Sequence, residues 1–101
     1  SKFDSWRGHM NKRIECTVSG RVQMVMYRDF VTRSARKLGI VGEVWNERDG
    51  TVRIVAEGDE ERLNLLIKLL HKGSLLARVE AVTVDWKEQS QTYHSFTIRY
   101  T

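Results

Sequence analysis

Residues 13–39 read RIECTVSGRVQMVMYRDFVTRSARKLG, and within them the spacing of the apolar side chains changes once. Residues 13–19 alternate between apolar and polar, which is typical of a strand with one buried face. The side chains on that face are Ile14, Cys16 and Val18. A loop from Gly20 to Met26 is expected to follow this strand.

From Tyr27 onward the apolar positions recur with the period of a helix, which predicts a helix ending at Gly39. Its stripe consists of Tyr27, Phe30, Val31, Ser34, Ala35 and Leu38. Basic side chains in its last turns face the negative end of the helix dipole.

A hairpin is predicted next. Residues 41–48 read as a strand, and Asp49-Gly50 is a strong turn signal between two strands. The returning strand directs Val52, Ile54 and Ala56 inward.

A second helix is expected to begin at the N-cap Asp59 and to end at Lys72-Gly73. Its stripe consists of Leu63, Leu66, Ile67 and Leu70. Residues 77–86 and 95–100 alternate again and are predicted as strands. Their apolar members are Val82, Val84 and Trp86, then Phe96, Ile98 and Tyr100.

The element order is therefore β-α-β-β-α-β. Two right-handed crossovers place both helices on one face of a four- to five-stranded antiparallel sheet. This arrangement is the α+β ferredoxin-like sandwich. Because one fold serves many functions, the function has to come from particular residues.

Composition agrees with one folded domain. The chain has 101 residues, of which 41% are hydrophobic and 30% charged, so intrinsic disorder is excluded. No apolar run approaches the ~20 residues of a transmembrane helix. Residues 1–10 lack periodicity and contain Gly8-His9-Met10, so we expect a tag or a disordered N-terminus there and a domain over 11–101.

The charge and the single cysteine limit the partners. A formal net charge of +4 favours anionic ligands over cationic ones, although ordinary solubilising charge accounts for it equally well. Cys16 has no partner for an internal disulfide, and no zinc-ligand spacing surrounds it. We therefore expect a cytoplasmic protein with no metal and no cofactor, and with Cys16 filling the core.

The segment from Gly20 to Arg28 joins a strand to the start of a helix. Backbone N–H groups in such a loop, together with the positive end of the helix dipole, form an anion site. Arg28 lies in the first helical turn, and its planar guanidinium matches phosphate oxygens. The candidate loop residues are Arg21, Val22, Gln23, Met24, Val25, Met26 and Tyr27. An ordinary strand–helix connection with a surface arginine is the alternative.

Asn46 precedes the Asp49-Gly50 turn and is expected to come near this loop. Its amide both donates and accepts hydrogen bonds, so it can hold a water molecule, but it cannot act as a strong base. An asparagine that satisfies turn backbone groups is the alternative.

These segments together resemble the acylphosphatase family, whose pattern reads G-x-V-Q-G-V-x-F-R in the loop and has an asparagine shortly before D-G-x-V. Here the matching stretches are Gly20 to Arg28, Asn46, Asp49 to Val52, and Ala56 to Gly58. The similarity extends from about Cys16 to Tyr100.

The resemblance implies hydrolysis of the carboxyl–phosphate bond of a small acyl phosphate to carboxylate and inorganic phosphate, without a metal. It implies that Arg28 and the loop amides bind the phosphoryl group and that Asn46 orients the attacking water. A monomer that binds neither nucleic acid nor membrane is expected.

Two departures from the pattern bear on activity. Met24 stands where the family has glycine, and Met26 occupies a position that is often small. If the backbone at Met24 needs a positive φ, the loop is strained or shifted. A phosphate-binding or regulatory domain with impaired catalysis is therefore an alternative function.

An RNA-binding module is a further alternative, because RNA-recognition domains share this fold. The outward side chains of the first and third strands, among them Thr17 and Arg53, offer no stacking platform.

Among the remaining candidates, His71 and His94 are expected in solvent and Trp86 in the core. Trp45 is expected either in the core or exposed at an edge of the sheet. Glu43 is expected to face either solvent or the phosphate site.

Overall fold

The computed structural model describes residues 11–90 and 92–100, so the expectation for residues 1–10 lies outside the described residues. The described elements are β1 (Asn11–Arg21), α2 (Tyr27–Lys37), β2 (Val41–Asn46), β3 (Val52–Asp59), α3 (Glu60–Lys72), β4 (Arg78–Glu88) and β5 (Phe96–Ile98). The order β-α-β-β-α-β is as predicted, and β5 is the fifth strand that residues 95–100 were expected to form.

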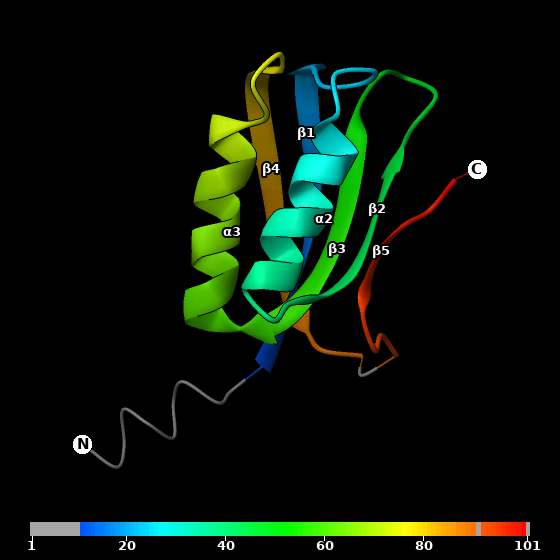
Figure 1. Ribbon diagram of the computed structural model, residues 1–101. Coiled ribbons are helices and arrows are strands. Elements are labelled where there is room, and N and C mark those ends of the chain that lie inside the picture. The colour runs from blue at the N-terminus through cyan, green and yellow to red at the C-terminus, as the bar shows by residue number, and fades with distance from the viewer. Residues whose placement is uncertain (1–10, 91, 101) are drawn as a thin grey trace.

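The strands form one sheet in the order β4-β1-β3-β2-β5. The β1–β3, β1–β4 and β2–β3 pairs are antiparallel, as expected, but β5 pairs with β2 in parallel. The expectation of an antiparallel sheet throughout is therefore wrong at this edge. After β4 the chain crosses the end of the sheet where β2 begins, so β5 runs back in the direction of β2 (Figure 1).

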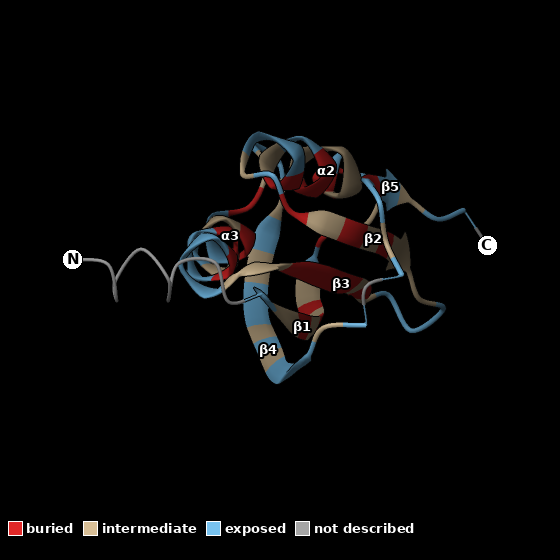
Figure 2. Ribbon diagram, turned by 90° about the horizontal axis from the view of Figure 1, so that it is seen from below, coloured by how far each residue is buried: buried red, intermediate tan, exposed pale blue. Residues whose placement is uncertain are grey.

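Both helices cover the same face of the sheet, as the right-handed crossovers predict (Figures 1 and 2). Most of the buried residues belong to the facing sides of the helices and the sheet (Figure 2). The predicted inward side chains of the first and third strands are all fully buried: Ile14, Cys16, Val18, Val52, Ile54 and Ala56. The alternation in the sequence therefore identified the core face of these two strands.

The helix ends agree with the signals in the sequence. The Asp59 carboxylate accepts a hydrogen bond of 2.8 Å from the Arg62 backbone N–H at the start of α3. Gly39, with φ of 68°, follows the C-cap of α2. In the hairpin turn, Asp49 accepts a 3.0 Å bond from the Thr51 N–H.

The first strand is longer than predicted. It continues through Gly20 to Arg21, because a bulge between Ser19 and Gly20 shifts the register and lets both later residues pair with β4. Gly20 has φ of 119°, and a Cβ atom there would lie 2.2 Å from the Arg78 carbonyl oxygen. The loop expected to start at Gly20 therefore starts after Arg21.

Trp86 was expected in the core, and the structure contradicts this. It is 43% exposed and lies opposite Ile14 on β4, the edge strand of the sheet. Because an edge strand has a neighbour on one side only, the sheet leaves the outer flank of the indole in solvent. His71 and His94 are exposed, as predicted.

The sheet face away from the helices carries mainly polar side chains on β1 and β3. Glu57, only 3% exposed, accepts hydrogen bonds there from Arg13 Nη1 at 3.0 Å and from Ser90 Oγ at 2.7 Å. The outward residues Thr17 of β1 and Arg53 of β3 form one cross-strand pair. Within the described part of β1 and β3 no aromatic ring is present, so these neighbouring strands carry no stacking platform.

Candidate active site

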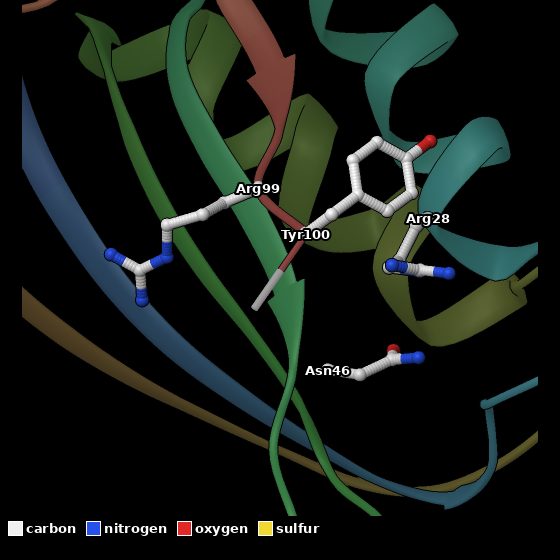
Figure 3. Close-up of a pocket in the computed structure, with 4 residues that line it drawn as sticks. All are labelled: Arg28, Asn46, Arg99 and Tyr100. Atoms are coloured by element: carbon white, nitrogen blue, oxygen red, sulfur yellow. The ribbon is translucent and has the colours of Figure 1, made fainter.

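A cavity of about 280 Å³ lies beside the N-terminus of α2, next to the end of β2 and the segment after β5. The residues that line it are Arg28, Asn46, Arg99 and Tyr100 (Figure 3). The two residues that sequence reasoning singled out, Arg28 and Asn46, therefore line one cavity although they belong to different elements.

The loop between β1 and α2 is anchored by buried side chains. Val22, Val25 and Tyr27 are each at most 7% exposed. The Tyr27 hydroxyl donates a 2.7 Å hydrogen bond to the Leu70 carbonyl, and the Ser74 hydroxyl donates one of 2.9 Å to the Val25 carbonyl. The loop is thus attached to the C-terminal end of α3 and the turn after it.

The anchored loop leaves a run of backbone donors available. Within the ranges 11–90 and 92–100, the N–H groups of residues 22–29 donate no hydrogen bond to another residue, and Phe30 N is the first to donate, to Met26 O at 3.1 Å. Met26 is the N-cap of α2 and caps it with no side-chain bond. Free N–H groups at the positive end of a helix dipole are the usual components of an anion site.

Met24 and Met26 both have φ of 60°, in the left-handed region. For residues other than glycine this conformation costs on the order of 1–2 kcal/mol each. The backbone at Met24 therefore does take the positive φ on which the expectation of a strained loop depended. The two side chains point outward and are 99% and 70% exposed.

Gln23 connects the loop to the hairpin that carries Asn46. Its Nε2 donates to the carbonyl oxygens of Glu47 at 2.7 Å and of Thr51 at 2.9 Å. The first of these carbonyls belongs to the residue next to Asn46. This side chain therefore fixes the distance between the loop and the strand end.

Arg28 and Asn46 offer complementary groups to the cavity. The Arg28 guanidinium carbon lies 5.1 Å from the centre of the Tyr100 ring, a cation–π contact that limits its orientation. The Oδ1 atom of Asn46 is buried and accepts no hydrogen bond from the described residues. Buried polar atoms are normally satisfied, so this oxygen is a suitable acceptor for a ligand or a water molecule.

Comparisons with known proteins agree with this geometry. The family model Acylphosphatase matches residues 14–98. The acylphosphatase of Salinibacter ruber is 44% identical over 87% of this chain and 93% of its own, and that of Thermococcus kodakarensis is 50% identical over 75% and 84%. The crystal structure of acylphosphatase from Bacillus subtilis superposes with a TM-score of 0.86 at 35% identity, covering 88% of this chain and 99% of that one.

This chain belongs to the acylphosphatase family. Its activity is accordingly the hydrolysis of acyl phosphates, and the ferredoxin-like architecture is that of its relatives. The resemblance first noted from the loop and the Asn46 region is confirmed over most of the chain.

Sequence reasoning missed two residues of the acylphosphatase cavity, Arg99 and Tyr100. The parallel pairing places Ile98 opposite Val44, and the Arg99 N–H continues the ladder with a 2.9 Å bond to the Val44 carbonyl. The same register brings Tyr100 beside Asn46. Alternation over 95–100 predicted a strand but contained no signal for the direction of its pairing.

Arg99 also decides the position of Glu43. The two side chains form an ion pair of 2.8 Å, and the Arg99 guanidinium lies 3.8 Å from the centre of the Trp45 ring. Figure 3 shows that Arg99 and Tyr100 leave the backbone in opposite directions, with the tyrosine toward Arg28. The negative charge of Glu43 is therefore compensated by Arg99. Trp45 is half-buried, between the two expected environments.

Cys16 takes no part in the chemistry of this acylphosphatase fold. Burial raises the pKa of its thiol to about 12, so the thiol is protonated at neutral pH and is a poor nucleophile. Burial likewise raises the pKa of Tyr27, which keeps its hydroxyl a donor to Leu70. Both residues are structural, as expected of Cys16.

No three His, Cys, Asp or Glu side chains of the described residues gather closely enough to hold a metal ion. No described helix has the length and apolar character needed to cross a bilayer.

Proposed function

We propose that Arg28 and the N–H groups of residues 22–29 bind the phosphoryl group of an acyl phosphate and that Asn46 orients the attacking water. The observation that carries this proposal is the cavity shared by Arg28 and Asn46 beside a loop whose amides are free. A guanidinium and several N–H groups compensate the charge of a phosphoryl dianion.

The reaction balances without an acid–base pair. The water oxygen bonds to phosphorus, and the bond from phosphorus to the acyl oxygen breaks with its electron pair going to the carboxylate. Both water protons stay on the released phosphate, so a substrate dianion and water give a carboxylate and dihydrogen phosphate. A carboxylate of pKa about 4 leaves without protonation.

The residues of the cavity supply what this chemistry needs. Positioning and electrostatic stabilisation carry most of phosphoryl transfer, and with so good a leaving group they are sufficient. Arg28 provides the positive charge, and the Asn46 amide holds water without having to remove its proton. We therefore propose that hydrolysis is independent of metal ions and persists in EDTA.

The roles are tested by two substitutions. Arg28→Ala should lower kcat/KM for acetyl phosphate by about 10²–10³-fold or more, because one charged donor is lost. Asn46→Ala should lower kcat by about 10²-fold while the inhibition constant of phosphate changes little, because it acts on the water. Retained turnover in Arg28→Ala, or weaker phosphate inhibition with normal kcat in Asn46→Ala, would contradict the assignment.

Matched controls separate these effects from surface charge and folding. Arg33→Ala removes an arginine of the same helix that pairs with Asp29 at 3.0 Å and lies outside the cavity. Asn64→Ala removes an exposed asparagine of α3. Both should keep the wild-type kcat/KM, and circular dichroism should show all four variants folded.

A second function is favoured by one observation, the left-handed backbone at Met24. If the strain misdirects the loop amides, the chain binds phosphate and turns acyl phosphates over slowly, as a regulatory domain would. A kcat for acetyl phosphate that rises at least tenfold in Met24→Gly would support this function.

The remaining properties follow as proposals. We propose that residues 11–101 form one monomeric acylphosphatase domain acting in the cytoplasm, where a lone thiol such as Cys16 stays reduced. No RNA binding is proposed, because β1 and β3 lack aromatic side chains facing outward. Sedimentation and an RNA shift assay on the full chain test these two statements.

A further inference from the structure

Met24 and Met26 are exposed apolar side chains held by an unfavourable backbone conformation. Each has φ of 60°, and they are 99% and 70% exposed. Neither the backbone conformation nor the exposed side chains stabilise the fold. A glycine or an asparagine would adopt this conformation more easily, and side chains that lie in solvent bury little apolar surface. Strained residues that contribute nothing to packing point to a function at the site where they occur.

The two methionines border a hollow next to the catalytic cavity. The hollow has a volume of about 390 Å³, and its apolar lining includes Val22, Met24, Met26 and Ile98. Arg28 and Tyr100 line both the hollow and the cavity that contains Asn46. A ligand bound to Arg28 through its phosphoryl group can therefore extend directly over apolar surface.

The direction of the reaction assigns this hollow to the leaving group. In phosphoryl transfer the attacking and leaving oxygens lie roughly in line on opposite sides of phosphorus. Asn46, which holds the water, lines the catalytic cavity but not the apolar hollow. The hollow begins instead at Arg28, so it is placed to receive the acyl group.

The charged groups at the hollow narrow the class of acyl group that it can bind. The Asp29 carboxylate also lines it, paired at 3.0 Å with Arg33 outside the hollow. Because Asp29 is already paired with Arg33, the mainly apolar lining of the hollow offers no partner for a second negative charge on the acyl group. The hollow therefore fits an uncharged apolar chain better than a dicarboxylic acyl group.

We propose that the hollow bordered by Met24, Met26 and Ile98 binds the acyl chain of the substrate, so that this enzyme selects acyl phosphates with an extended, uncharged apolar acyl group. The inference rests on the proposed roles of Arg28 and Asn46. It adds the substrate class, which the phosphoryl-binding residues alone do not determine.

The first test is a substrate series on the wild-type protein. We expect kcat/KM to rise about two- to fourfold for each methylene from acetyl to hexanoyl phosphate, so at least about tenfold overall, because each methylene leaves water for the apolar hollow. Succinyl phosphate should fall below butyryl phosphate, which has the same number of carbon atoms. Equal kcat/KM for acetyl and hexanoyl phosphate would overturn the proposal.

The second test replaces the two apolar side chains by polar ones. Met24→Asn/Met26→Asn removes the apolar surface and places at both positions a residue that adopts a positive φ more easily, so the loop conformation is retained. The hexanoyl-to-acetyl ratio of kcat/KM should fall at least about fourfold, because about half of the free-energy gain is lost over four methylenes that each contribute about two- to fourfold. The ratio is the readout, whatever happens to the acetyl phosphate rate.

A matched control uses exposed apolar residues elsewhere. Leu75→Asn/Leu76→Asn replaces side chains that are 97% and 69% exposed and line no part of the hollow. It should keep the wild-type ratio, and a ratio that falls equally in both double variants would overturn the proposal. Hydrolysis of acetyl phosphate by the wild type, with its loss in Arg28→Ala, tests the proposed catalytic roles separately.

Discussion

Gln23 Nε2 donates a hydrogen bond of 2.7 Å to the carbonyl oxygen of Glu47, the residue that follows Asn46. A second bond from the same nitrogen reaches the Thr51 carbonyl at 2.9 Å on the other side of the hairpin. One amide thus holds together the loop between β1 and α2 and both strands of the hairpin. The separation of the loop amides from Asn46 therefore depends on the Gln23 side chain. In the proposed roles of these groups, a displacement of ~1 Å is enough to reduce catalysis strongly.

Gln23→Leu removes both bonds and leaves the Glu47 carbonyl without this donor. We expect the free energy of unfolding to fall by about 1–3 kcal/mol and kcat for acetyl phosphate to fall by about 10²-fold. Urea unfolding and steady-state kinetics measure the two effects.

Asp59→Ala is the matched control for Gln23→Leu, because it removes the N-cap of α3 at a comparable cost of about 1 kcal/mol. It should destabilise the fold and leave kcat unchanged. If kcat followed stability equally in both variants, Gln23 would have no positioning role.

Gly20 lies at the bulge of β1, one residue before the end of the strand at Arg21. Gly20→Ala would place a Cβ atom 2.2 Å from the Arg78 carbonyl oxygen at φ of 119°. We expect a loss of stability on the order of 3–5 kcal/mol, because backbone atoms on both sides must move.

Gly50→Ala separates the clash from the conformational strain. Gly50 has φ of 92°, but no atom of the described residues outside its own turn lies within 4 Å of the position of its Cβ atom. Its replacement should cost only about 1 kcal/mol. Urea unfolding of the two variants measures the difference, and equal losses would show that the bulge accommodates a side chain.

The sequence predicted the parts of the site that depend on local pattern. Alternation in β1 and the helical stripe after Tyr27 locate the loop between them, and Asp49-Gly50 locates the end of the strand that carries Asn46. Each of these signals involves residues close together in the chain. The positions of the loop and of Asn46 could therefore be predicted from the sequence alone.

The features missed depend on contacts between distant parts of the chain. Tyr100 reaches Arg28 only because β5 pairs in parallel with β2, and no local pattern sets the direction of a three-residue edge strand. Trp86 was misjudged for a related reason. Its place in an alternating run predicts the face on which it lies but not that its strand is at the edge of the sheet.

Cys16 provides a test of burial in the centre of the sheet. Because burial raises the pKa of its thiol to about 12, we expect no measurable reaction with Ellman's reagent at pH 8 in the folded protein. The thiol should react at the rate of a free cysteine once urea unfolds the chain. Cys16→Ala should lower stability by about 1–2 kcal/mol and keep the wild-type kcat, whereas rapid labelling of the folded protein would contradict the burial of Cys16.

Glu15 gives the fold a stability that depends on pH. Hydrogen bonds from Lys87 Nζ at 2.9 Å and from Arg13 Nε at 2.8 Å lower the pKa of its carboxyl group. A pKa lower in the folded than in the unfolded state means that unfolding takes up a proton over that range. The contribution is therefore fully present above the unfolded pKa of about 4.3 and is lost as the pH falls through the folded value.

Glu15→Gln should remove that contribution. We expect the variant to be less stable than the wild type at pH 7 and to lose less stability between pH 7 and pH 3, measured by urea unfolding at both values. Glu80→Gln is the control, because Glu80 is exposed on β4 and has no ion-pair partner among the described residues. If Glu15→Gln lost as much stability on acidification as the wild type, the hydrogen bonds from Lys87 and Arg13 would not be what lowers the pKa of this carboxyl.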